Sequence, residues 1–150
     1  IAAQLIAALP ADKQELVDPG LRDIARIGAE YTTAEYLAAV QARREMTFRV
    51  NVFFQTYDLL LTPTLPLTAF PAGQNTPRTA GERSWVNWTP FSYPFNLSRY
   101  PAATVPCGLV EGLPAGLQIV GRHHEDALVL RAARAFERAH PWPLPPAATA

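Results

Sequence analysis

Fifteen of the 150 residues are prolines, and most of these prolines follow residue 60. Proline has a fixed φ angle and no backbone N–H, so it interrupts helices and is kept out of the middle of most sheets. Average proline usage is about 5%, which is half of the usage here. The second half of the chain is therefore expected to be rich in loops.

Composition and charge narrow the class of protein. Hydrophobic residues make up 49% of the chain and charged residues 17%, which is enough apolar material for one packed domain. Thirteen basic and thirteen acidic residues cancel, so the totals indicate neither a nucleic-acid partner nor a membrane surface. The apolar runs are shorter than the roughly 20 residues that span a bilayer.

Cys107 is the single cysteine, which excludes an internal disulfide and the usual zinc frameworks. We expect a cytoplasmic protein without a metal or a cofactor.

Two start signals predict helices in the first part of the chain. Asp18 precedes a proline and is typical of a helix N-cap, so a short helix is expected over about 19–30. Thr32 and Glu35 have the spacing of a capping box, in which each side chain bonds the other residue's backbone N–H. The apolar residues that follow have helical spacing, which predicts a long helix over about 33–56.

Three short apolar runs bounded by proline or glycine predict strands: "DLLLTPT", "PAATVPCG" and "AGLQIVG". The first is continuously apolar, which suits a strand buried on both faces. Glu111 and Gly112 form a turn signal that joins the other two. Residues 63–93 show no sustained period and predict a long irregular excursion, and such loops are usually functional or disordered. A final helix is expected over 123–140, with acidic residues at its positive end.

No evident catalytic set appears among the side chains. A serine or cysteine nucleophile needs a base within hydrogen-bond reach, and a metal needs several convergent ligands. Cys107 lies between strand residues and is expected to be a small, buried, apolar side chain. His123 and His124 are adjacent and point in different directions, so we expect a solvated loop rather than a metal site. Lys13 is the only lysine and lies in a predicted exposed turn, which does not favour a deprotonated amine.

One aromatic cluster stands out in the loop-rich region, formed by Trp85, Trp88, Phe91 and Tyr93. Aromatic residues next to strand ends often line a small-molecule pocket, and they equally often cover the edge of a core. Both interpretations are left open by the sequence.

Three segments can be compared with known families: "YDLLLTPTLP", "WTPFSYPFNLSRYPAATVPCG" and "GLPAGLQIVGRHHEDALVLRAARAFE". In order and spacing, these segments together resemble the C-terminal part of the amidase signature family. The resemblance extends from about Pro19 to Trp142. It implies an α/β fold in which a mixed β-sheet is flanked by helices, here incomplete. The expected segments are a helical part over 1–57, strands and a long loop over 58–122, and a C-terminal helix over 123–140.

The resemblance also implies an activity, the hydrolysis of carboxamides to a carboxylate and ammonia or an amine. The family uses a serine nucleophile, a second serine joined by a cis peptide, a lysine base and backbone N–H groups that hold the oxyanion. These residues belong to a glycine- and serine-rich N-terminal signature that this sequence does not contain. We therefore assign no catalytic residue and expect the chain by itself to be inactive.

The sequence departs from the family pattern after Asn96, where "N-L-T-G-x-P" is usual and "NLSRYP" occurs. Arg99 replaces a glycine, which would be strained if the position needs a positive φ. Asn96 itself matches, and in the simplest interpretation it bonds neighbouring backbone. The segment from Phe95 to Gly121 is expected to pack beside the catalytic centre.

A second departure concerns the substrate. The glutamyl-tRNA amidotransferase A subunit typically carries an aspartate seven residues before the asparagine, where this chain has Thr89. Without that anion, recognition of glutamine is harder to explain, so we favour a general amidase for uncharged or aromatic amides. The alternatives are the A subunit of a tRNA-dependent amidotransferase, which would bring nucleic acid in, and a non-catalytic binding module. The substrate-pocket candidates are Thr62, Trp85, Trp88, Thr89, Phe91 and Asn96.

The chain begins inside a helical pattern at Ile1, and its only methionine is Met46. We expect a piece of a longer protein whose N-terminal half is a partner of this one. Separated from that half, the sheet is expected to expose an edge and an apolar face, which promotes association into a dimer or larger assembly. No membrane partner is expected.

Overall fold

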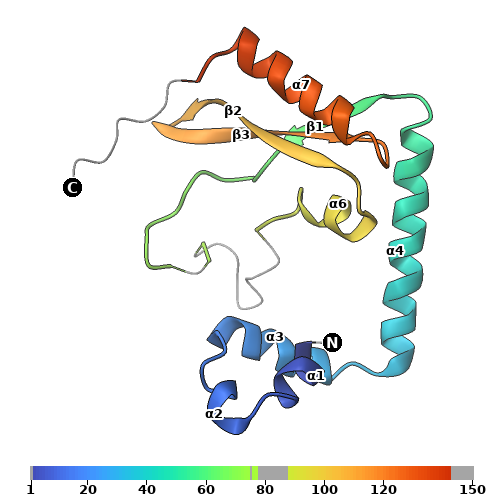
Figure 1. Ribbon diagram of the computed structural model, residues 1–150, viewed down its shortest axis with the longest axis vertical. Coiled ribbons are helices and arrows are strands. Elements are labelled where there is room, and N and C mark those ends of the chain that lie inside the picture. Colours follow the sequence, from blue (N-terminus) through green and yellow to red (C-terminus); the bar gives the residue numbers. More distant parts are fainter. Residues whose placement is uncertain (1, 75, 78–87, 143–150) are drawn as a thin grey trace. The chain divides into compact units, whose positions relative to one another are not determined.

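The computed structural model describes residues 2–74, 76–77 and 88–142 (Figure 1). The chain divides into two compact units, one over Ile1–Ala42 and a second that begins at Arg43. The division of the chain into three segments at residues 57 and 122, which the sequence suggests, remains a prediction.

The first unit is helical. It contains α1 (Ala2–Ala7), α2 (Ala11–Gln14) and α3 (Pro19–Ala29), and α1 packs against α3. Leu21 N donates a 3.1 Å hydrogen bond to Asp18 Oδ1, so the predicted N-cap of α3 is confirmed. The four-residue helix α2 was not predicted.

Helix α4 (Thr33–Phe53) begins with the predicted capping box. Thr32 N donates to Glu35 Oε2 at 2.8 Å, and Glu35 N donates to Thr32 Oγ1 at 3.2 Å. Hydrogen bonds from Thr32 lower the pKa of Glu35 because they favour its charged form. The bond from the backbone N–H of Thr32 has the largest effect, and the bond from its side chain comes next. The helix ends three residues before the predicted 56, since Phe54 begins a turn.

The second unit contains a three-stranded antiparallel sheet in the order β1-β3-β2. The strands are β1 (Leu59–Pro63), β2 (Ala102–Val110) and β3 (Leu113–Gly121). The turn predicted at Glu111 and Gly112 is confirmed. Both residues have a positive φ, 52° and 79°, as a two-residue hairpin that matches the strand twist requires.

Each face of this sheet is covered by different elements. Helix α7 (Asp126–Ala139) lies along one face, where Val105, Ile119 and Val129 form a buried cluster. On the other face lies the short helix α6 (Tyr93–Ser98), which Figure 1 shows on the opposite side of the sheet from α7. The cluster there consists of Phe54, Phe95, Tyr100 and Val120. Ile119 and Val120 are neighbours in β3 and face opposite sides because side chains alternate along a strand.

Two predictions about helices need correction. Helix α7 begins at Asp126 rather than at 123, because His124 has a φ of 65° and turns the chain before the helix starts. Helix α6 lies where only strands and loop were expected; Pro94 occupies its first turn, where the missing N–H costs nothing.

Two predictions about burial are also wrong. Leu61 of β1 is 57% exposed, so β1 is not buried on both faces. Cys107 is exposed rather than buried. The reason is a β-bulge: Pro106 pairs with Gly116 and Gly108 with Ala115, which leaves Cys107 as the extra, unpaired residue of β2.

No helix in the described part of the chain is both long enough and apolar enough to cross a bilayer.

Candidate functional site

Gln118 is the centre of a polar network inside the second unit. It lies in β3 and only 6% of its surface is exposed. Its Nε2 donates to Thr62 Oγ1 at 2.9 Å and to the Phe91 carbonyl oxygen at 3.0 Å. Thr62 Oγ1 donates in turn to the carbonyl oxygen of Pro63 at 3.0 Å. The network joins β3, β1 and the segment that precedes α6.

The strand register places these groups together. Thr62 of β1 and Gln118 of β3 are direct cross-strand partners, so their side chains lie on the same face of the sheet. That face also carries Val120, which packs against Phe95 of α6. Phe91 stands two residues before α6, and its carbonyl is therefore held close to the same face.

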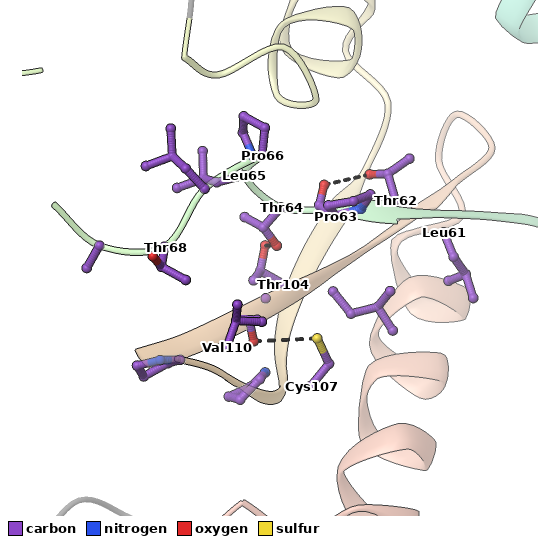
Figure 2. Close-up of a pocket in the computed structure, with 17 residues that line it drawn as sticks. Leu61, Thr62, Pro63, Thr64, Leu65, Pro66, Thr68, Thr104, Cys107 and Val110 are labelled. Carbon is purple, nitrogen blue, oxygen red and sulfur yellow. Dashed lines mark hydrogen bonds between the residues drawn. The ribbon is translucent and has the colours of Figure 1, made fainter. Parts of the chain in front are cut away.

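A second polar pair lies next to this network. Thr64 Oγ1 and Thr104 Oγ1 are 3.2 Å apart, and Figure 2 shows the two side chains directed toward each other. A Cβ atom at Gly116 would lie 2.7 Å from Thr64 Oγ1 and 3.0 Å from a methyl carbon of Thr104. Glycine at 116 is therefore what allows the two threonines to approach across β3.

These threonines line a groove of about 900 Å³, and Figure 2 shows its residues. We call it the threonine groove. Its walls are predominantly apolar and come from β1 with the segment after it, β2 and β3: residues 61–69, Thr104, Pro106, Cys107, Val110 and residues 114–117. Cys107 Sγ lies 3.5 Å from the carbonyl oxygen of Ala115 at the groove wall. Such a groove suits an apolar molecule or segment with a few hydrogen-bonding groups.

The C-terminal end of α6 is held by a separate set of contacts. The ring of His123 stacks on Tyr100, with centroids 3.9 Å apart and an interplanar angle of 17°. His123 Nε2 lies 2.9 Å from the carbonyl oxygen of Ser98, and Ser98 Oγ donates to the carbonyl of Pro94. Burial raises the pKa of the Tyr100 phenol. These contacts fix the turn in which α6 ends.

Arg99 caps α6 in the left-handed conformation, with φ 62° and ψ 35°. The position has a positive φ, which is the condition under which the sequence predicts that an arginine is strained.

The predicted pocket residues make different contacts in the structure. Thr62 and Phe91 are brought together through Gln118. Trp88 instead packs edge-on against Phe70, with ring centroids 5.4 Å apart. The carbonyl of Thr89 accepts a hydrogen bond from Ser92 N at 3.1 Å.

Two further candidates contribute less to this arrangement. The side chain of Asn96 is exposed on α6, and its expected bond to neighbouring backbone stays a prediction. Trp85 lies outside the described residues. Sequence reasoning missed Gln118, although a lone amide inside the apolar run "GLQIVG" was a usable signal, since a buried polar side chain needs partners.

No group of three or more His, Cys, Asp or Glu side chains that could hold a metal ion occurs in the described part of the chain. Lys13 lies in α2 of the first unit. The described residues of the second unit therefore contain no lysine that could serve as a base for a serine.

Comparison with known proteins gives a consistent result. The family model described as Amidase matches residues 7–130. An acylamidase of Rhodococcus erythropolis is 40% identical over an alignment of 120 residues, and the match covers 73% of this chain and 25% of the relative. The A subunit of the glutamyl-tRNA(Gln) amidotransferase from Geobacillus thermodenitrificans is 38% identical over 113 residues, 75% of this chain and 23% of the relative. The chain thus spans about a quarter of the length of the curated relatives it matches.

Solved structures agree in fold. A bacterial aryl acylamidase of the amidase signature family has a TM-score of 0.75 and 29% identity, and the match covers 94% of this chain and 32% of that one. A second amidase structure has a TM-score of 0.77 and 28% identity, covering 91% of this chain and 32% of that one. The expected incomplete α/β fold is confirmed by these matches.

Proposed function

We propose, because this chain belongs to the amidase family, that it is the C-terminal part of an enzyme that hydrolyses carboxamides to a carboxylate and ammonia or an amine. The observation that carries the proposal is the family match over residues 7–130. The polar network around Gln118 and the threonine groove support it, since they combine apolar walls with a few oriented hydrogen-bonding groups.

The reactive groups come from elsewhere in the parent protein under this proposal. The family resemblance implies two serines and a lysine. The lysine can act as a base only where burial and neighbours lower its pKa, and the anionic intermediate needs preorganised N–H donors. This chain then builds the surroundings of the reaction and is inactive alone.

The substrate is proposed to be an uncharged or aromatic amide. Thr89 carries no negative charge that would recognise an α-amino group, and the threonine groove is mostly apolar. The alternative is the A subunit of a tRNA-dependent amidotransferase, which the similarity to the Geobacillus protein favours. In that case partner chains and tRNA would take part.

The N-terminal half of the parent is the proposed partner of this chain, and β1 is the edge that it would join. Thr64 N donates to Gly116 O across β1 and β3, so by antiparallel alternation the N–H groups of Leu59 and Leu61 point away from β3. On that side β1 has no strand partner among the described residues. The opposite edge, β2, is interrupted by Pro106, which has no N–H, and by the bulge at Cys107.

A cytoplasmic location is part of the proposal, since the single cysteine has an exposed free thiol.

The test compares the full-length parent with this chain alone. We expect the parent to release ammonia or amine from aryl and alkyl amides and this chain to release none. Free glutamine is the discriminating substrate: much faster hydrolysis of glutamine than of simple amides would favour the amidotransferase. Turnover by this chain alone, or a parent without serines and a lysine, would contradict the proposal.

A further inference from the structure

We propose that Gln118 is a positioning residue for the substrate pocket: its side-chain amide holds the segment 88–91 against the sheet and so determines how well aromatic amides bind. The inference rests on the proposed amidase function. Gln118 would not touch the reacting atoms. It would act through the Phe91 carbonyl, which it anchors from β3.

The orientation of the Gln118 amide follows from its partners. The carbonyl oxygen of Phe91 can only accept, so the nitrogen of the amide must face it. The hydroxyl of Thr62 already donates its hydrogen to the Pro63 carbonyl, so toward Gln118 its oxygen accepts. Both hydrogens of Nε2 are therefore used, and only one orientation of the amide satisfies both partners.

The segment that Gln118 holds includes pocket candidates of the sequence. Trp88 and Thr89 lie three and two residues before Phe91, and Trp88 packs edge-on against Phe70. Of the described side chains, Gln118 is the one that bonds the backbone of residues 88–91 to the sheet. If the bond were lost, the Phe91 carbonyl would need another donor, and the segment would have to move toward water.

An apolar side chain would fill the same place in the strand. Position 118 is buried, and its neighbour Val120 on the same face is apolar, so a packing role alone would be met by methionine or leucine. The amide differs from these residues in its two directed hydrogen bonds. If Gln118 positions the segment, the effect of a substitution at 118 should depend on whether the new side chain donates hydrogen bonds and not on its volume.

The experiment uses three variants of the full-length parent. Gln118→Met keeps the volume and removes both donors. Gln118→Glu keeps the shape but places a carboxylate, which can only accept, against the Phe91 carbonyl. The matched control is Ile119→Val, which removes a methylene from the next residue of β3, on the face that α7 covers.

The first readout is kinetic. We expect Gln118→Met to raise KM for an aryl amide about tenfold or more, with kcat changed less, while KM for acetamide stays within about twofold. Ile119→Val should leave the ratio of the two KM values unchanged. Equal effects on both amides, or the same pattern in Ile119→Val, would overturn the inference.

A second readout separates positioning from packing. A buried carboxyl regains a proton at a raised pKa and can then donate to the Phe91 carbonyl. The KM of Gln118→Glu relative to the unaltered enzyme should therefore fall as pH is lowered, while that of Gln118→Met stays high. A ratio for Gln118→Glu that does not change with pH would contradict donation by this side chain.

The third readout needs no activity. Amide hydrogen exchange in residues 88–92 of the parent should be at least about tenfold faster in Gln118→Met than in Ile119→Val. If the unaltered parent hydrolyses no amide, the proposed function fails, and exchange still decides whether Gln118 holds the segment. Unchanged exchange there would overturn the inference even in an active amidase.

Discussion

A Cβ atom placed on Gly121 would lie 2.6 Å from Cγ2 of Val129, so the last residue of β3 and the first turn of α7 touch at the limit that glycine allows. Val129 is only 2% exposed and its β-branched side chain has few rotamers. The contact therefore sets how closely α7 approaches the sheet. Because Val129 belongs to the cluster with Val105 and Ile119, the same contact fixes the packing of one whole face.

Replacing Gly121 by alanine is expected to destabilise the protein. The added methyl group must displace Val129 or move α7, and overpacking of this kind costs about 1–3 kcal/mol. Urea denaturation of Gly121→Ala, followed by circular dichroism, measures the loss.

The matched control is Gly28→Ala in α3. A Cβ atom at Gly28 would meet nothing within 4 Å, and alanine favours helix by roughly 0.5–1 kcal/mol over glycine. We expect Gly28→Ala to be neutral or stabilising. Equal losses in the two variants would mean that the contact with Val129 is not the cause.

The capping box at the start of α4 predicts a dependence of stability on pH. Hydrogen bonds from Thr32 hold the pKa of Glu35 below the value of 4.5 that an unperturbed glutamate has, so the folded pKa is lower than the unfolded one. A depressed carboxyl pKa contributes stability that is present above 4.5 and is lost as the pH falls through the folded pKa. Glu35→Gln should remove this dependence.

Denaturation measured at several pH values tests the contribution of this capping box to stability. The difference in unfolding free energy between the unaltered chain and Glu35→Gln should be constant above the unfolded pKa and shrink in more acid solution. Thr32→Ser keeps the hydroxyl and should retain the dependence. A difference that grows on acidification would contradict the assignment.

Local signals in the sequence predicted much of this fold. Asp18, the Thr32 and Glu35 pair, and the turn at Glu111 act within a few residues, so their bonding patterns can be recognised without the rest of the structure. Three short apolar runs predicted the strands, and the family resemblance implied a sheet flanked by helices. The predictions of caps and turns succeeded because the interactions are local.

The features that the sequence analysis got wrong or missed depend on residues far apart in the chain. Whether Cys107 is buried depends on a one-residue mismatch between β2 and β3, which composition does not reveal. Gln118 acquires its importance from Thr62, which is 56 positions away, and from Phe91, which is 27 away. Long-range pairing sets both features, so the sequence alone could mark Gln118 as a polar residue in an apolar run but could not identify the partners that it connects.

The Cys107 thiol is expected to react readily in the folded chain. It is exposed in the bulge at the wall of the threonine groove. One equivalent of a chromogenic disulfide reagent should be consumed without denaturant, and Cys107→Ser should consume none. Reaction only after unfolding would show that the bulge is closed in solution.

Self-association of the isolated chain should depend on the β1 edge. Leu61 is 57% exposed, its N–H points away from β3, and an apolar edge strand recruits further strands. Light scattering should detect a dimer or larger assembly, and Leu61→Lys should shift it toward monomer because an edge lysine would have to be desolvated on pairing. The control is Leu109→Lys, since Leu109 is similarly exposed at 60% but lies in β2 beyond Pro106 and the bulge, where pairing is already interrupted. A chain that stays monomeric at high concentration, or one that Leu109→Lys dissociates as effectively, would mean that β1 is not the edge that seeks a partner.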